Sequence, residues 1–222
     1  MSVNYMAGLR RYWCNDGALR NIGVETNINA ILVNGKDFKW QLGATLGHYK
    51  NEVTALPEAD YTTSIYSGEV LTSVGNPVGL FYGYKTNGII QENQEGIPTS
   101  QGGEKRSPGQ IDYVDLNGNG YLDPGDRTIL GNPNAKFNYG FSTSLSIENF
   151  RLAINFQGVY GRDIYNANLA SDLDNNYLSY NFRRDAYYNA WTPENPSDKY
   201  MKLGGWNNTE RYYSTDRYIE DG

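Results

Sequence analysis

Hydrophobic and polar residues alternate along residues 23–33, "GVETNINAILV". The alternation places Val24, Thr26, Ile28, Ala30 and Leu32 on one face, and Glu25, Asn27 and Asn29 on the other. A period of two is typical of a β-strand with two different faces. The next residues, "NGKD" (34–37), predict a tight turn, and "FKWQLGATLGHY" continues the alternation with Phe38, Trp40, Leu42, Ala44 and Leu46 on one face. We therefore expect a β-hairpin at about residues 22–50.

A second pair of alternating segments predicts another hairpin, at about residues 136–160. The segment "FNYGFSTSLSI" (137–147) groups Phe137, Tyr139, Phe141, Thr143, Leu145 and Ile147 on one face. After "EN", the segment "FRLAINFQGVY" (150–160) groups Phe150, Leu152, Ile154 and Phe156. Each expected strand is about ten residues long, which is the length of a strand that crosses a membrane.

The polar faces of these strands are rich in Asn, Gln, Ser and Gly. The solvent face of a soluble β-sandwich usually favours Lys, Glu and Thr, so this composition better suits the wet lumen of a β-barrel whose other face meets lipid. An ordinary antiparallel sandwich would alternate as well. Both architectures are therefore compatible with the alternation alone.

The lengths of the connections favour the barrel. Both hairpin turns are short, whereas the segments at about 51–135 and 161–222 are long, and a membrane barrel has short turns on one rim and long loops on the other. Phe38 and Trp40 are expected near the short-turn rim, with Phe137, Tyr139 and Tyr160 near the long-loop rim. Four strands cannot close such a barrel, so we expect an all-β chain that forms part of one.

The composition argues against several classes of protein function. The net charge is −6 without a basic block, which argues against nucleic acid as a partner. Cys14 is the single cysteine, which excludes an internal disulfide. His48 is the single histidine and is interpreted as a rim residue of a strand, so we predict no enzyme activity. The sequence has no apolar run of about 20 residues, its start lacks the pattern of a signal peptide, and its abrupt end suggests a piece of a longer protein.

The stretch "DLNGNGYLDPGD" (115–126) matches the spacing of a calcium-binding loop. Side-chain oxygens fall at positions 1, 3, 5, 9 and 12 of the loop, with Gly120 at the sharp turn and the backbone carbonyl of Tyr121 at position 7. These side chains belong to Asp115, Asn117, Asn119, Asp123 and Asp126. Position 12 is Asp rather than Glu, which shortens the reach of the last ligand. A structural calcium ion and a metal-free turn are both compatible with the spacing.

The aromatic residues Phe81, Tyr82 and Tyr84 lie in a glycine-rich part of the first long loop, "VGNPVGLFYGYKTNGIIQ" (74–91). They are candidates for contact with a ligand or a partner, and packing inside the loop is the alternative interpretation. In the second long loop, "NFRRDAYYNAWT" (181–192) predicts a short helix that ends at Thr192–Pro193.

Six stretches in this order resemble the SusC/RagA family of TonB-linked outer-membrane transporters of Bacteroidetes. They are "NIGVETNINA", "KDFKWQLGATLGHYKNEVTAL", "VGNPVGLFYGYKTNGII", "DYVDLNGNGYLDPGDRTILGNPNAKFNYGFSTSL", "FRLAINFQGVYGRDIYN" and "WTPENPSD". The stretches cover nearly the whole chain and correspond to the later barrel strands of such a transporter. The plug domain and the TonB box lie outside this sequence.

The resemblance implies a part of a large outer-membrane β-barrel with long extracellular loops. It also implies the uptake of a glycan or a peptide together with a SusD-like surface lipoprotein, powered through the TonB system. A different class also fits the residues, namely a secreted calcium-dependent β-sandwich that binds carbohydrate. That class would account for the aromatic residues and for the Asp- and Asn-rich loop.

Overall fold

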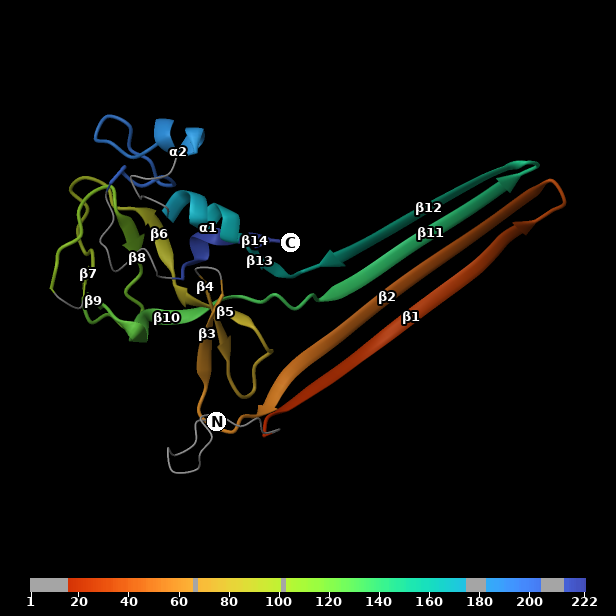
Figure 1. Cartoon of the computed structure of the whole chain (residues 1–222), viewed down its shortest axis with the longest axis horizontal. Helices are drawn as coiled ribbons and strands as arrows, with labels where there is room; N and C mark the ends of the chain where they lie inside the picture. Colours follow the sequence, from red (N-terminus) through yellow and green to blue (C-terminus); the bar gives the residue numbers. More distant parts are fainter. Residues whose placement is uncertain (1–15, 66–67, 101–102, 175–182, 205–213) are drawn as a thin grey trace, which may run out of the picture.

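The protein is mostly antiparallel β-structure, as expected, and consists of one long sheet joined to a second folded unit (Figure 1). The computed structural model describes residues 16–65, 68–100, 103–174, 183–204 and 214–222. Cys14 lies outside these residues. We call the described parts of 56–136 and 161–222 the loop unit, because they comprise the two long connections.

The long sheet contains four antiparallel strands in the order β1-β2-β11-β12. Their bounds are β1 Ala18–Asn34, β2 Phe38–Ala55, β11 Phe137–Ile147 and β12 Phe150–Tyr160. Both tight turns lie at the same end of the sheet, where the amide N–H of Glu148 donates to the carbonyl of Asp37 at 2.8 Å. Both long connections leave from the opposite end (Figure 1). The two predicted hairpins are therefore confirmed, and so is their common orientation.

The strand register keeps the two faces of the sheet separate, because directly paired residues in antiparallel strands point to the same side. One row across the sheet is Ile28–Ala44–Phe141–Phe156, and the adjacent row is Asn27–Thr45–Gly140–Gln157. The register of the first hairpin is interrupted at one position. A bulge at Leu32 breaks the register, so that Ile31 pairs with Gln41 but Val33 pairs with Trp40. Val33 therefore lies on the same face as Trp40.

The apolar face of the long sheet is largely exposed. Phe150 is 82% exposed, Val24 70% and Phe156 61%. Soluble proteins rarely expose a continuous apolar patch of this kind, so this face requires an apolar environment such as lipid or other protein.

Strands β1 and β2 are longer than predicted, at 17 and 18 residues. The additional residues pair beyond the predicted ends and carry the first hairpin into the loop unit. There Asn51 is buried; its amide nitrogen donates to Asn21 at 2.7 Å, and its side-chain oxygen accepts the N–H of Val78 at 2.8 Å. The long sheet and the loop unit are thus connected by hydrogen bonds as well as by the chain.

The loop unit contains four small sheets. The largest is antiparallel in the order β10-β5-β4-β3, with bounds β3 Tyr61–Ile65, β4 Gly68–Thr72, β5 Leu80–Tyr84 and β10 Arg127–Gly131. The others pair β6 Thr86–Ile89 with β8 Ile111–Tyr113, β7 Thr99–Ser100 with β9 Tyr121–Leu122, and β13 Asp163–Tyr165 with β14 Ile219–Asp221. The β7–β9 pair is parallel.

A single buried cluster holds both long connections together. It comprises Tyr84, Ile89, Ile111, Tyr113, Leu122 and Trp191, with Met201 packed against it. Five of its residues precede β11, whereas Trp191 follows β12. The two connections therefore fold as one body with its own core.

The helices of the loop unit are short: α1 spans Ala167–Asp174 and α2 spans Arg184–Tyr188, and two single 3₁₀ turns occur at Pro124–Asp126 and Asp216–Tyr218. The helix predicted at 181–192 is found as α2, which ends before Thr192; residues 181 and 182 lie outside the described part. Neither α1 nor α2 has the length and apolarity needed to cross a membrane.

Candidate functional site

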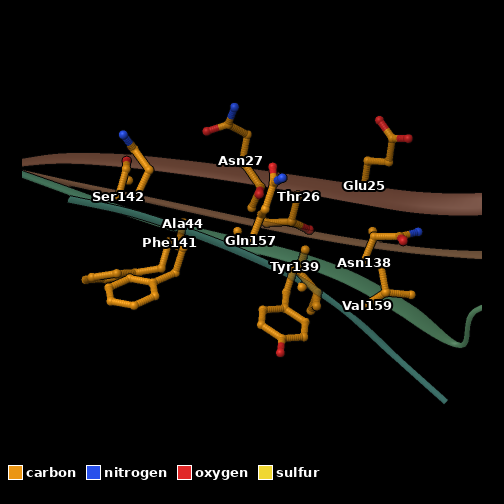
Figure 2. Close-up of a pocket in the computed structure, with 18 of the residues that line it drawn as sticks. Glu25, Thr26, Asn27, Ala44, Asn138, Tyr139, Phe141, Ser142, Gln157 and Val159 are labelled. Carbon is orange, nitrogen blue, oxygen red and sulfur yellow. The ribbon is translucent and has the colours of Figure 1, made fainter. Parts of the chain in front are cut away.

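The polar face of the long sheet runs across all four of its strands. Glu25, Asn27 and Asn138 project to one side of the sheet, whereas Tyr139 and Phe141 project to the other (Figure 2). A hollow beside these strands is lined by residues of both faces, so it is an open surface of the sheet and not an enclosed cavity.

Glycines make room for amide and hydroxyl groups on this polar face. A Cβ atom on Gly43 would lie 2.5 Å from Oγ of Ser142 and 3.0 Å from Oδ1 of Asn29. The face carries amides, hydroxyls and glycines, as in the row Asn27–Thr45–Gly140–Gln157, and this composition suits a water-filled lumen.

His48 lies on the apolar face close to the end of the sheet that joins the loop unit. Its Nδ1 atom is 2.5 Å from the carbonyl oxygen of Lys136, and its ring lies 5.3 Å from that of Phe137. The imidazole is thus occupied in packing and in one backbone hydrogen bond.

The three predicted aromatic contact residues lie on β5 of the loop unit. Phe81 and Tyr84 are buried at 7% and 6% exposure, so both rings pack inside the loop unit in this structure. Tyr82 is partly exposed and lies under the guanidinium of Arg127, whose Cζ is 4.9 Å from the ring centroid. Arg127 also forms an ion pair with Glu69, and burial lowers the pKa of its guanidinium. Contact of these rings with a ligand stays a prediction.

The Asp- and Asn-rich turn at 115–126 is held by hydrogen bonds to its own backbone. The carboxylate of Asp115 accepts the N–H groups of Gly118 and Gly120, each at 2.7 Å. These bonds, led by the one from Gly120, lower the pKa of Asp115. Asn119 Oδ1 accepts the N–H of Tyr121 at 2.7 Å. Side-chain oxygens within the turn therefore accept many of the N–H groups of its tight backbone.

Asp126 is the anchor of this turn because its side chain is fully buried. One carboxylate oxygen accepts the N–H groups of Leu116 and Asn117 at 2.9 and 3.2 Å, and the other accepts that of Asp123 at 2.8 Å. Asp123 in turn accepts the N–H of Gly125 and an amide N–H of Asn119. Over the described ranges, no three His, Cys, Asp or Glu side chains gather as a metal site would require. Calcium binding at this turn stays a prediction.

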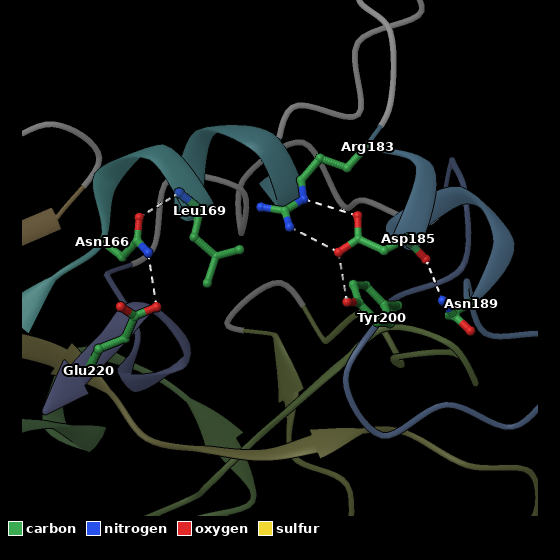
Figure 3. Close-up of polar contacts among 7 residues, drawn as sticks. All are labelled: Asn166, Leu169, Arg183, Asp185, Asn189, Tyr200 and Glu220. Carbon is green, nitrogen blue, oxygen red and sulfur yellow. Dashed lines mark hydrogen bonds and ion pairs between the residues drawn. The ribbon is translucent and has the colours of Figure 1, made fainter.

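A small hollow beside α2 was not expected from the sequence. Its lining residues include Tyr187, Tyr188, Trp191, Pro193 and Lys202. Asp185 fixes α2 next to it: both of its oxygens accept from the guanidinium of Arg183, at 3.0 and 2.9 Å, and one also accepts the hydroxyl of Tyr200 at 3.1 Å (Figure 3). The hydrogen bonds from Arg183 are the main reason that the pKa of Asp185 falls to about 2. The dense aromatic cluster "AYYNAW" was the available signal in the sequence.

The long sheet and its one-sided connections define a class of protein, the outer-membrane β-barrel, of which this chain forms an unclosed part. Comparisons with known proteins agree with that class. The chain is 30% identical over 227 residues to TonB-dependent receptor P26 of Formosa agariphila, an alignment that covers all of this chain and 22% of the relative. It is 28% identical over 189 residues to TonB-dependent receptor SusC of Bacteroides thetaiotaomicron, which covers 79% of this chain and 17% of the relative.

A solved structure described as the RagAB peptide transporter has the same fold over this region. The TM-score is 0.71 at 20% identity, and the match covers 99% of this chain and 23% of the other. No protein-family model matches the chain. The chain thus spans less than a quarter of the lengths of these relatives. The findings confirm the resemblance: the chain corresponds to a barrel segment of a SusC/RagA-type TonB-dependent receptor.

Proposed function

We propose that the chain is part of an outer-membrane transporter that takes up a glycan or a peptide. The observation that carries the proposal is the long sheet, which has an open apolar face on one side and a face of amides, hydroxyls and glycines on the other. A barrel strand requires this division, because one face meets lipid and the other meets water. The named relatives, which are receptors and transporters, support the same proposal.

The loop unit supports an extracellular position for the long connections. In outer-membrane barrels the long loops emerge on the outer side and the short turns on the inner side. The loop unit would then lie at the outer rim, where nutrient arrives. We propose a SusD-like lipoprotein as its partner there, and the similarity of the chain to TonB-dependent receptor SusC and to the RagAB peptide transporter supports this proposal. Energy would come from the TonB system through parts of the transporter beyond this segment.

The structure gives little support to the alternative of a secreted β-sandwich. In a sandwich a second sheet would cover the apolar face of the first. Among the described residues, the long sheet contacts other sheets only where it joins the loop unit, and Phe150 and Phe156 are uncovered. A secreted monomer with such a face would aggregate.

A pair of charge substitutions in the full-length protein that carries this segment tests the proposal. Phe141→Arg places a cation on the apolar face, which costs about 2–4 kcal/mol at the middle of a bilayer. Ser142→Arg places the same cation on the polar face of the same strand. We expect Phe141→Arg to reduce the amount of folded protein in the outer-membrane fraction and to reduce nutrient uptake by the cells, while Ser142→Arg leaves the amount unchanged. Recovery of the parent protein in the soluble fraction, or equal behaviour of the two variants, would contradict the proposal.

A further inference from the structure

The hollow beside α2 has the size of a small-molecule site. Its volume is about 540 Å³, and it is lined by Tyr187, Tyr188, Ala190, Trp191, Thr192, Pro193, Asn195, Lys202 and Leu203. Binding sites for small ligands are about 300–1,000 Å³ in volume and are mostly apolar, with a few polar groups. The hollow shares no lining residue with the surface of the long sheet, so it is separate from the polar face of the strands. In Figure 1, α2 lies at the top of the loop unit, away from the long sheet.

The floor of the hollow is held in place by the core of the loop unit. The indole of Trp191 donates from Nε1 to Oε1 of Gln91 at 2.9 Å and is only 6% exposed. Beneath it, Gly109 has a φ of +88°, and a Cβ atom there would lie 2.7 Å from the indole and 2.8 Å from Cβ of Lys202. Only glycine allows this close approach. The hollow is therefore preformed, which lowers the entropic cost of binding.

Exposed aromatic rings form its wall. Tyr187 is 55% exposed and Tyr188 70%, with ring centroids 5.4 Å apart and planes at 89°. The two rings thus present surfaces at right angles to one another. Covering them with the apolar face of a ligand is favourable, and their hydroxyl groups can remain in water.

The charged groups at the hollow are mainly cationic. Lys202 lines it and has no ion-pair partner within the described ranges, and Arg184 lies over the ring of Tyr188 at 5.8 Å. The nearby carboxylate of Asp185 is already bound by Arg183 and Tyr200. Glu194 is close in sequence but is not among the lining residues. Lys202 therefore offers a cation to an anionic ligand at this hollow.

The backbone around the hollow argues against an extended peptide as the ligand. Thr192 and Asn195 exchange backbone hydrogen bonds at 3.2 and 3.1 Å, and the N–H of Lys202 donates to the carbonyl of Gly109 at 2.9 Å. Peptides that add as a strand need an edge with unpaired backbone groups. With these groups already paired, recognition depends on side-chain surfaces, which a compact ring can cover.

We propose that this hollow binds a saccharide ring that carries a carboxylate, as in a uronic acid unit. The ring packs on Tyr187 and Tyr188, and the carboxylate pairs with Lys202. The biological purpose of this inference rests on the proposed uptake function, since the hollow would concentrate acidic glycans at the outer rim. Binding itself can be measured without transport, so a failure of one does not imply a failure of the other.

Calorimetric titration of the full-length protein in detergent tests this site. The probes are a short oligogalacturonate, the neutral oligogalactan of equal length and an acidic peptide of similar mass. The variants are Lys202→Met, which keeps the stem beside Gly109, and Tyr188→Ala. Their matched controls are Lys105→Met and Tyr121→Ala, which change exposed residues elsewhere in the loop unit.

We expect the acidic sugar to bind more tightly than the neutral one and more weakly at high salt. Lys202→Met should weaken binding of the acidic sugar about 2- to 5-fold and abolish the preference. Tyr188→Ala should weaken both sugars about 2- to 10-fold. The controls should bind as the parent does. Absence of sugar binding, equal affinity for both sugars, tighter binding of the peptide, or insensitivity to both variants would each overturn the proposal.

Discussion

The indole Nε1 of Trp191 donates a 2.9 Å hydrogen bond to Oε1 of Gln91, a residue 100 positions earlier in the chain. Gln91 belongs to the connection between the two hairpins, and Trp191 to the connection that follows the second hairpin. The same indole is part of the buried cluster that includes Tyr84 and Ile111. The two long connections consequently stabilise each other, and a substitution in the core of one should destabilise the other.

Replacement of Trp191 by Ala should destabilise the whole loop unit. Removing a buried aromatic side chain typically costs about 3–5 kcal/mol, and here Gln91 also loses its donor. Tyr188→Ala removes an exposed ring from the same region and should change the free energy of unfolding by less than about 0.5 kcal/mol. Urea denaturation followed by tyrosine and tryptophan fluorescence measures both. Similar midpoints for the two variants would show that the cluster does not hold the connections together.

Gly83 should tolerate no side chain. Its ideal Cβ would collide with the backbone carbonyl oxygen of Ser214, the same oxygen that accepts the N–H of Tyr84 at 2.9 Å. Gly83→Ala should therefore displace residues 214–222 from β5 and lower the melting temperature by several degrees. The control is Gly47→Ala, because the nearest atom to that Cβ is 3.7 Å away. Faster proteolysis near Ser214 in the first variant alone is the expected signature, and an unchanged cleavage pattern would count against it.

Asp185 should make the stability of the loop unit depend on pH in the acid range. Arg183 and Tyr200 hold its pKa at about 2, below the ordinary 3.8. A depressed carboxyl pKa stabilises the folded state above pH 3.8, and this contribution is lost as the pH falls from 3.8 towards 2. A carbon-detected NMR titration should place the Asp185 midpoint near pH 2. Arg183→Met should move it upward by more than Tyr200→Phe does. An ordinary midpoint in the parent protein would refute the arrangement in Figure 3.

The turn at 115–126 gives a direct test of calcium binding. We expect millimolar calcium to raise the melting temperature modestly, and Asp115→Ala to remove the rise. Magnesium at the same concentration serves as the control, because it is bound less readily by a flexible set of oxygen ligands. If calcium does not shift the melting temperature of the parent protein, the calcium hypothesis is wrong. The turn would then be held by its internal hydrogen bonds alone.

The strands of the long sheet could be predicted from the sequence because successive residues face opposite sides of the sheet, one side apolar and the other polar. Phe141, Ser142 and Thr143 alternate between faces, and this local signal needs no knowledge of partners. The bulge at Leu32 could not be predicted, since three apolar residues in a row, Ile31 to Val33, carry no preference for either face. A register shift there depends on the partner strand.

The core and the short strands of the loop unit could not be predicted from the sequence, for a different reason. Its core joins residues as far apart as Tyr84 and Trp191, and none of its short strands is long enough to show a period. The sequence could not show whether the rings of Phe81 and Tyr84 are buried, because their burial depends on contacts such as that of Tyr165 with Phe81, whose ring centroids are 6.0 Å apart. The hollow beside α2 depends in the same way on Gly109, which is distant in sequence from Trp191 and Lys202.

The proposal that one face of the long sheet meets lipid and the other meets water can be tested at two adjacent residues. Phe156 and Gln157 are neighbours on β12 whose pairs, Phe141 and Gly140, place them on opposite faces. In the full-length protein in intact outer membranes, on a Cys14→Ser background, Phe156→Cys and Gln157→Cys should be labelled with a water-soluble maleimide and, separately, with a lipid-partitioning one. We predict that the Gln157→Cys variant reacts with the water-soluble reagent and that the Phe156→Cys variant reacts only with the lipid-partitioning one. Equal reaction of both variants with the water-soluble reagent would contradict the barrel assignment.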